Sequence, residues 1–417
     1  MNTLINNIRQ LVAVPPGPVS GEAFSSPPVI ENAAVVLEDD RIAWFGQAEE
    51  TPGGSYDATV DADGGTVVPG LVDCHTHVVF AGSRENEYVQ RIGGATYLDI
   101  MHAGGGIRSS MQALRRATID DLVRCAAPRL RRMLASGTTT VEAKTGYGLT
   151  PDDEFKTLLA IKRLAAESPI DIVGTFLGAH TIPPEYDGRS DEYIRAITDE
   201  MLLSRVRADG LAEFADVFCE RGAFNVEQSR HYLSKCVRHG LKPKIHSEQI
   251  TNSGGTRLAI ELEAVSADHL ECIDDETITA MTGSKTIPVL LPGCSFFLDT
   301  PPAPARKLIA AGLPVALATD CNPGSCMIES LPLIMSIAAS LLKMTPMESL
   351  VACTANAAAA IARAGSIGAI APGYLADLLI LDVPNVNRWA YQVGVNAVRT
   401  VIKRGRVVLE NWENQAL

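Results

Sequence analysis

Two histidines, His75 and His77, separated only by Thr76, directly follow the apolar run from Val67 to Cys74. Residues two apart on a β-strand point to the same side of it. Imidazole is the commonest protein ligand of catalytic transition metals. The pair therefore indicates half of a metal site at the tip of a strand. The alternative is two ordinary polar residues leaving a strand, and only further ligands elsewhere in the chain exclude it.

The middle of the chain alternates between apolar, β-branched runs and segments with helical spacing. The eight runs are Val67–His75, Thr138–Thr145, Asp171–His180, Phe214–Glu220, Pro243–Glu248, Ala264–Leu270, Thr286–Pro292 and Pro314–Asp320. The helical segments include Asp120–Ala135, Asp152–Ala166, Asp191–Arg207 and Val226–His239. Apolar strands that alternate with helices predict a parallel sheet covered on its faces, and eight such units predict a closed (β/α)8 TIM-like barrel. An open doubly wound sheet is disfavoured because no G-x-G-x-x-G follows the first strand. We expect Gly104–Gly106 to form a mobile loop.

Both ends of the chain differ from the middle and resemble each other. Ala33–Gly46 predicts a hairpin that turns at Asp39-Asp40. The segments 376–382 and 398–409 predict further short strands, and the second of them turns at Arg404-Gly405. Neither end has enough apolar surface to fold alone. We therefore expect residues 1–65 and 363–417 to form one small composite β-sandwich domain beside a barrel of residues 66–362.

Composition excludes several classes of partner. The formal net charge is −13, which argues against nucleic acid or an anionic membrane surface as a partner. The nine cysteines show no C-x-x-C spacing, and the start of the chain lacks the build of a signal peptide. No apolar stretch is long enough to span a bilayer. The expectation is a cytoplasmic protein with reduced thiols.

In a barrel of this kind, chemistry lies at the carboxyl ends of the strands. Five of the eight histidines fall at predicted strand ends, whereas His102, His231 and His239 do not. The residues at these ends are His75, His77, Lys144, His180, Glu220, His246, Asp268, His269 and Asp320. This clustering makes a set of ordinary core histidines improbable.

The pattern of strand ends resembles the mononuclear branch of the amidohydrolase superfamily. The resemblance implies a metal held by His75, His77, His246 and Asp320, with His269 as the additional strand-six histidine. Binuclear members carry a bridging lysine after strand four, where this chain has Cys219-Glu220-Arg221. The resemblance thus implies one ion, and three imidazoles with one carboxylate suit zinc or iron.

Longer motifs resemble the imidazolonepropionase family over essentially the whole chain. They are Asp73–His77 with Ala81–Glu85, Lys144–Leu149, Phe176–Tyr186, Ser266–Leu270 and Ala318–Gly324. Small departures occur at Ala81, where glycine is usual, and at Ser325-Cys326, where relatives often have Thr-Ser. Neither departure involves an expected ligand.

The resemblance implies hydrolysis of 4-imidazolone-5-propanoate to N-formimidoyl-L-glutamate, by attack of metal-activated water on a cyclic amide. Asp320 and His269 are the implied catalytic residues, and the assignment of general base between them is open. Arg84 is implied to bind the substrate carboxylate, although without the resemblance it reads as a surface arginine paired with Glu85 or Glu87. The other implied substrate contacts are Tyr147, His180, Gln249, Asn322, Gly324 and Ser325.

Other functions stay open at this point. A related mononuclear enzyme, such as a guanine or cytosine deaminase, would attack an amidine-like carbon and release ammonia. A non-catalytic barrel would have lost ligands, whereas all four expected ones are present. Cys74 and Cys321 flank ligands on strands, so they face the opposite side and are expected to pack rather than bind metal. The resemblance also implies a homodimer.

Overall fold

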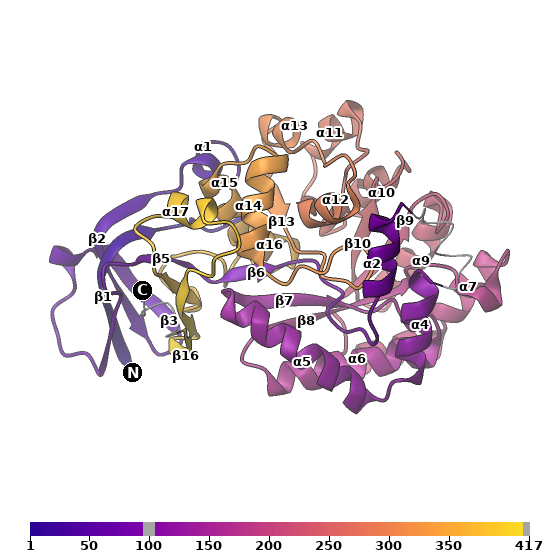
Figure 1. Ribbon diagram of the computed structural model, residues 1–417, viewed down its shortest axis with the longest axis horizontal. Coiled ribbons are helices and arrows are strands. Elements are labelled where there is room, and N and C mark those ends of the chain that lie inside the picture. The colour runs from indigo at the N-terminus through magenta and orange to yellow at the C-terminus, as the bar shows by residue number, and fades with distance from the viewer. Residues whose placement is uncertain (95–104, 412–417) are drawn as a thin grey trace.

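The computed structural model describes residues 1–94 and 105–411 and contains two eight-stranded sheets. In Figure 1 one sheet, built from indigo and yellow strands, lies at one end of the molecule, and the other sheet with its helices forms the larger part. Gly104 and His102 lie outside the described residues, so the loop expected around Gly104–Gly106 is described only from Gly105 onward.

The first sheet joins strands from both termini in the order β16-β15-β14-β5-β1-β2-β3, with β4 paired to β1. Its strands are β1 (Asn2–Val12), β2 (Val29–Glu38), β3 (Arg41–Gln47), β4 (Ala58–Asp61), β5 (Thr66–Pro69), β14 (Leu378–Leu381), β15 (Val398–Lys403) and β16 (Arg406–Glu410). The two predicted hairpins are confirmed, because Glu38 pairs with Arg41 and Lys403 pairs with Arg406. The predicted association of strands from both ends of the chain is confirmed as well.

The second sheet is the predicted parallel barrel. Its strands follow the chain: β6 (Leu71–Asp73), β7 (Thr138–Lys144), β8 (Asp171–Ala179), β9 (Phe214–Cys219), β10 (Lys242–Ser247), β11 (Ser266–His269), β12 (Ile287–Leu290) and β13 (Ala316–Leu317). All eight fall within or beside the predicted runs. The ring closes past the last strands, where Thr76 bridges to Cys321 and the amide of His77 donates to the carbonyl of Cys321 at 3.0 Å.

The first predicted strand, 67–75, is wrong as a single element. β5 belongs to the terminal sheet, where it pairs with β1 and β14, and β6 belongs to the barrel, where it pairs with β7. Gly70 separates them. A Cβ at this position would lie 2.4 Å from Oγ1 of Thr139, so the chain passes from one sheet to the other at a point too tight for any side chain.

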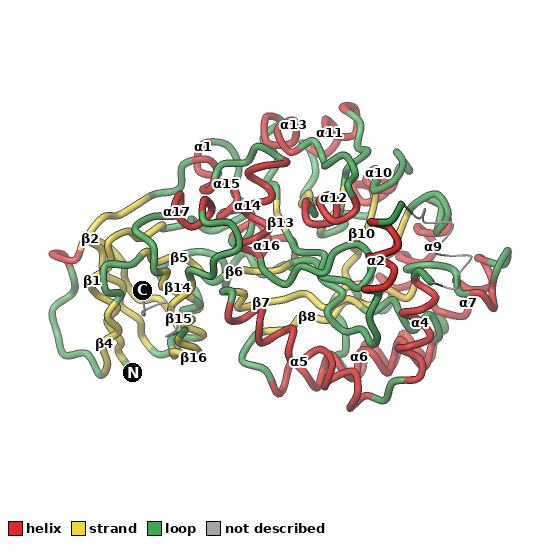
Figure 2. The backbone as a smooth tube through the Cα atoms, viewed as in Figure 1, coloured by secondary structure: helices red, strands yellow, loops and turns green. Residues whose placement is uncertain are grey.

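Most helices lie around the barrel, as the red segments of Figure 2 show, while α1 and α17 lie towards the terminal sheet. They are α1 (Glu22–Ser25), α2 (Glu85–Ile92), α4 (Ile107–Arg116), α5 (Ile119–Ala135), α6 (Pro151–Glu167), α7 (Ser190–Ile197), α8 (Glu200–Ala208), α9 (Val226–Arg238), α10 (Gly255–Glu261), α11 (Asp275–Met281), α12 (Pro292–Leu298), α13 (Ala305–Ala310), α14 (Leu331–Leu341), α15 (Pro346–Ala352), α16 (Ala355–Ala360) and α17 (Val386–Tyr391). None of those in the described ranges is long and apolar enough to cross a membrane.

Capping residues explain where these helices begin. Capping boxes start α5 at Thr118 and α9 at Asn225, because the side chain of each accepts from the backbone of the third helical residue. The predicted single helix 191–207 is instead two helices. Asp199 accepts from the amides of Met201 and Leu202, so it starts a new helix, α8, inside the predicted segment.

Candidate metal centre at the barrel mouth

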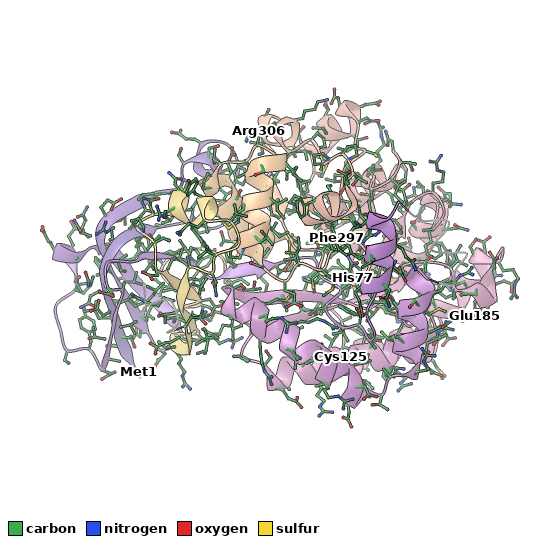
Figure 3. The ribbon with its side chains drawn as sticks, in the orientation of Figure 1. Met1, His77, Cys125, Glu185, Phe297 and Arg306 are labelled. Atoms are coloured by element: carbon green, nitrogen blue, oxygen red, sulfur yellow. The ribbon has the colours of Figure 1, made fainter. Side chains whose placement is uncertain are left out.

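Four histidines from three strand ends meet inside the barrel. The Nε2 atoms of His77 and His246 lie 3.4 Å apart, and the rings of His75 and His246 have centroids 4.4 Å apart. Ligand atoms of His75, His246 and His269 all lie within 4.8 Å of one another, as do those of His75, His77 and Asp320. All of these side chains are buried, and Figure 3 shows His77 within the barrel, well apart from Met1 in the terminal sheet.

Asp320 faces two of these rings. Its Oδ1 lies 3.6 Å from Nε2 of His75 and 3.6 Å from Nε2 of His77. Its amide donates to the carbonyl of His75 at 3.0 Å, which fixes the end of strand eight against the end of strand one. Asp320 has a φ of 52°, and such left-handed backbone in a non-glycine residue is typical of functional sites. Burial raises the pKa of the Asp320 carboxyl.

Burial favours the neutral form of His75 and His77, which is the form that binds metal. Burial lowers the pKa of His75 well below its usual range, and the ammonium of Lys144 lowers it further. The pKa of His77 is also lowered by burial and then by the neighbouring His180. Nε2 of His75 is buried and has no hydrogen-bond partner within the described residues. An unpartnered donor atom beside a carboxylate and two further imidazoles fits a transition-metal ion.

Two carboxylates stand behind the ligands. Oδ2 of Asp268 lies 2.6 Å from Nδ1 of His75, and Oδ2 of Asp216 lies 2.9 Å from Nδ1 of His246. Carboxylates in these places orient the rings so that each Nε2 faces the cluster. Burial opposes ionisation of Asp216, but His246 and Lys144 hold its pKa well below the usual range.

Glu271 stands beside His269. Its Oε1 lies 3.6 Å from Nδ1 of His269, and its Oε2 is buried without a hydrogen-bond partner among the described residues. Burial lowers the pKa of His269, but Glu271 outweighs this effect, so the pKa is raised overall. His269 is thus electrostatically different from the neutral His75 and His77.

Tyr147 and His180 form one wall of the site. The ring of His180 stacks on that of His77 with centroids 5.1 Å apart, and Tyr147 lies 5.5 Å from His180 in an edge arrangement. Nδ1 of His180 lies 2.9 Å from the carbonyl of Gly146. Burial, and then His246, lower the pKa of His180 to about 4.

A buried carboxylate holds the loop that carries Tyr147. Glu154, on α6, accepts from the amides of Gly146 at 2.9 Å and of Gly148 and Leu149 at 2.8 Å each. Gly146 (φ 113°) and Leu149 (φ 56°) both have left-handed backbone, so the loop depends on this anchor.

Arg84 reaches the turn that follows Asp320. Its Nε donates to Glu87 at 2.7 Å, and its guanidinium lies against Gly324. Asn322 builds this turn, because its Oδ1 accepts from the amides of Gly324 and Ser325 at 2.8 Å each, and its Nδ2 donates to the carbonyl of Asp320 at 2.7 Å. Oγ of Ser325 lies 3.4 Å from Oδ2 of Asp320.

The predicted site residues thus lie at one end of the barrel, although they follow different strands of the chain. Gln249 is half-buried and contacts Sγ of Cys294 at 3.5 Å, near the end of β10.

Cys74 and Cys321 are fully buried in apolar clusters, as expected for packing residues. All nine cysteines lie in the described ranges and are free thiols.

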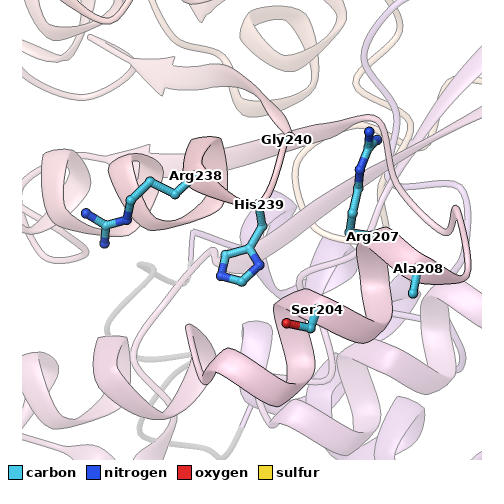
Figure 4. Close-up of a pocket in the computed structure, with 6 residues that line it drawn as sticks. All are labelled: Ser204, Arg207, Ala208, Arg238, His239 and Gly240. Atoms are coloured by element: carbon cyan, nitrogen blue, oxygen red, sulfur yellow. The ribbon is translucent and has the colours of Figure 1, made fainter.

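A pocket elsewhere on the molecule does not belong to this site. Figure 4 shows Ser204, Arg207, Ala208, Arg238, His239 and Gly240 around it. These residues lie where α8 and α9 end, just before β9 and β10 begin, so the pocket is at the opposite end of the barrel from the histidines. Helix carboxyl ends carry partial negative charge, which the basic side chains complement.

Sequence reasoning missed most of the residues that support the ligands. Asp216, Lys244, Glu154 and Glu271 received no role, and Lys144 and Asp268 were noted only as strand ends. One signal was available: Glu142 with Lys144, and Lys244 with His246, are charged or polar residues two apart within strands that are otherwise apolar.

Comparison with known proteins agrees with this geometry. A family model described as the amidohydrolase family matches residues 66–408. The imidazolonepropionase of Geobacillus kaustophilus is 48% identical over 98% of both chains, and that of Chloroflexus aggregans is 46% identical over 98% of both.

Solved structures share the fold at low identity. A triazine hydrolase variant superposes with a TM-score of 0.77 at 16% identity, covering 98% of this chain and 95% of that one. A 5-methylcytosine deaminase from Klebsiella pneumoniae superposes with a TM-score of 0.75 at 19% identity, covering 98% and 97%. At these identities the likeness shows the fold alone, whereas the sequence relatives share nearly half of all residues. The chain therefore belongs to the amidohydrolase family and, within it, to the imidazolonepropionases.

Proposed function

We propose that this protein hydrolyses 4-imidazolone-5-propanoate to N-formimidoyl-L-glutamate, a step of histidine degradation. The cluster of His75, His77, His246 and Asp320 at the barrel mouth carries the proposal, together with relatives of nearly equal length named imidazolonepropionase. The reaction adds water across a cyclic amide, so that the ring C–N bond breaks, the carbonyl carbon becomes a carboxylate and the ring nitrogen takes a proton.

We propose that His75, His77, His246 and Asp320 hold one zinc or iron ion. The unpartnered Nε2 of His75 and the oxygen of Asp320 that faces two imidazoles support this ligand set. When bound, such an ion polarises a carbonyl and lowers the pKa of coordinated water to about 7, so that a nucleophile exists at neutral pH. Strand four ends without a lysine, which supports a single ion.

Asp320 is the proposed proton carrier. Its Oδ1 faces the imidazoles, and its Oδ2 lies near the hydroxyl of Ser325, outside the ligand cluster. Oδ2 is thus free to accept a proton from the attacking water and to deliver it to the leaving ring nitrogen. The raised pKa of this carboxyl favours the first of these steps, because a stronger base takes up the proton more readily.

His269 is proposed to stabilise the oxyanion that develops on the carbonyl oxygen. Glu271 raises its pKa, which favours the protonated, hydrogen-bond-donating ring. His180 has the opposite character, since its lowered pKa keeps it neutral. We propose that His180 and Tyr147 contact the imidazolone ring.

The substrate carboxylate is proposed to bind Arg84, whose planar guanidinium suits bidentate contact with a carboxylate. Gly324 and Ser325 lie beside it, and Asn322 holds their backbone in place. Gln249 is the proposed contact for the ring amide, because a side-chain amide can both donate and accept but cannot act as a general base.

Purified protein loaded separately with zinc and with iron tests the function. We expect loss of the imidazolone with formation of N-formimidoylglutamate, and no ammonia from cytosine or guanine. Ammonia release from those bases without turnover of the imidazolone would favour the deaminase alternative.

Three further properties are proposed. The nine free thiols support a cytoplasmic location. The chain is proposed to divide into a terminal domain, 1–65 with 363–417, and a barrel domain, 66–362, and limited proteolysis would test it. Pairing of β5 with both β1 and β14 supports a terminal domain built from the two ends of the chain, although β5 itself (Thr66–Pro69) lies just inside the proposed barrel range. The homodimer rests on the family resemblance, and sedimentation analysis would test it.

A further inference from the structure

Five charged side chains lie wholly buried beneath the histidine cluster. They come from four barrel strands and are Glu142, Lys144, Asp216, Lys244 and Asp268, each 0% exposed. Ionised side chains are almost never placed in a protein interior unless they are paired. Asp216 and Asp268 orient two of the ligand rings, but the proposed mechanism gives no role to Glu142, Lys144 or Lys244.

Lys144 lies at the centre of the group. Its Nζ is 2.7 Å from Oδ2 of Asp216, 3.0 Å from Oε2 of Glu142 and 3.6 Å from Oδ2 of Asp268. Three carboxylates around one ammonium outweigh the effect of burial and raise the pKa of Lys144, so it stays charged.

Lys244 completes the charge balance on the other side of Glu142. Its Nζ lies 2.8 Å from Oε2 of Glu142 and 3.0 Å from the carbonyl of Cys74. Among the described residues it forms no ion pair with Asp216 or Asp268. Both lysines therefore contact Glu142, but only Lys144 contacts the two aspartates.

The oxygens that Lys144 contacts are the oxygens that face the ligand rings. Oδ2 of Asp268 lies 2.6 Å from His75, and Oδ2 of Asp216 lies 2.9 Å from His246. One ammonium therefore ties together the partners of two ligands that come from opposite parts of the barrel, strand one and strand five.

We propose that Lys144 is a positioning residue that fixes the rings of His75 and His246 through Asp268 and Asp216, and thereby determines how slowly the protein releases its metal ion. This inference rests on the proposed metal centre. Without the ammonium, three buried carboxylates would share Lys244 alone. Asp216 and Asp268 would then lose the contact that holds their Oδ2 atoms in place, and the imidazoles that these oxygens face would lose their fixed orientation.

The rate of metal transfer to an excess of chelator tests this proposal. Lys144→Met keeps the length of the side chain and removes the charge. We expect release about 10–100-fold faster than from the wild type, the usual effect of losing a residue that orients a metal ligand. Metal content per chain before chelation and the midpoint of thermal unfolding are measured on the same samples.

Lys403→Met is the matched control. Lys403 is also a buried lysine between two carboxylates, at 2.7 Å from Asp171 and 2.6 Å from Asp377, but it lies in the terminal sheet. We expect this variant to lose thermal stability while it releases metal at the wild-type rate. The comparison separates positioning of the ligands from general destabilisation.

Release from folded Lys144→Met no faster than from Lys403→Met would overturn the proposal. If Lys144→Met does not fold, Lys144→Gln, whose amide can still donate to one carboxylate, is measured against the same control with the same criteria. A wild-type protein that retains no zinc or iron after loading would instead refute the metal centre itself.

Discussion

A Cβ atom at position 324 would lie 2.2 Å from Nη1 of Arg84. The guanidinium therefore reaches the turn after Asp320 only because that residue is glycine. Arg84 comes from the segment after strand one and Gly324 from the segment after strand eight. This close approach therefore joins the two sides of the barrel closure where we propose that the substrate carboxylate binds.

Gly324→Ala should displace Arg84. We expect KM to rise about tenfold or more with a smaller change in kcat, because loss of one hydrogen bond to a charged group costs about 1.5–3 kcal/mol. Steady-state kinetics at fixed metal content measure this. Gly283→Ala is the control, since no atom lies within 4 Å of its added methyl group. Equal KM values in both variants would contradict the prediction.

Arg84→Lys keeps the charge and removes the planar fork. We expect KM to rise about 10–100-fold with kcat nearly unchanged, because an ammonium cannot replace a bidentate contact with a carboxylate. Arg124→Lys, at an exposed surface pair with Asp121, should leave both constants at wild-type values. An unchanged KM in Arg84→Lys would exclude Arg84 as the carboxylate-binding residue.

His269→Ala tests whether this histidine acts in the chemical step or holds the metal. We expect the metal content to stay intact while kcat falls about 10²–10³-fold, the usual effect of removing one hydrogen-bond donor to a developing oxyanion. His239→Ala, at the opposite end of the barrel, should leave both kcat and the metal content at wild-type values. Near-normal turnover would refute the role, and loss of the metal would show that His269 is a ligand, as its place beside His75 and His246 allows.

Glu154→Gln should loosen the loop that carries Tyr147. An amide cannot accept all three backbone N–H groups, so we expect the free energy of unfolding to fall by about 1–3 kcal/mol. Chemical denaturation at pH 7 measures this. Glu192→Gln, at an exposed pair with Arg189, should change it by less than about 0.5 kcal/mol.

The same variant should alter the dependence of stability on pH. Burial raises the pKa of Glu154 in the folded chain above its ordinary value, although backbone N–H groups and Thr145 oppose this effect. The folded state then binds more protons than the unfolded state, so this group's contribution to stability falls as pH rises from the ordinary value of about 4.3 through the raised one. Glu154→Gln should lack this pH-dependent contribution to the free energy of unfolding. If the wild type and the variant showed the same dependence of unfolding free energy on pH, the prediction would be contradicted.

The strand ends could be predicted from sequence because they combine two independent signals. Apolar, β-branched runs locate the strands, and the histidines and Asp320 stand just beyond them. The order of strands in a parallel barrel then brings His75, His246 and Asp320 together although they are far apart in the chain. The fold class follows from this pattern, whereas the choice of ligands among the strand-end residues came from the family resemblance.

The change of sheet at Gly70 and the charged residues behind the ligands could not be predicted in the same way. The run from Val67 to Cys74 gives no sign that it crosses between sheets, because both halves are buried and only the packing of Thr139 against Gly70 reveals the change. Pairing of Lys144 with Asp216 depends on which strands are neighbours and on side-chain reach. A single sequence reports neither.

The passage at Gly70 also bears on how the protein is made. β5, which leads directly into the strand before His75, lies between β1 and β14, and the amide of Gly70 donates to the carbonyl of Asp377 at 2.8 Å. During synthesis, residues up to the end of β14 must therefore leave the ribosome before β5 and Gly70, which precede the first ligand strand, can pair with β14 and Asp377. A nascent chain that has emerged only as far as Asp320 already contains every proposed ligand, yet it lacks β14, which pairs with β5 just before the first ligand strand.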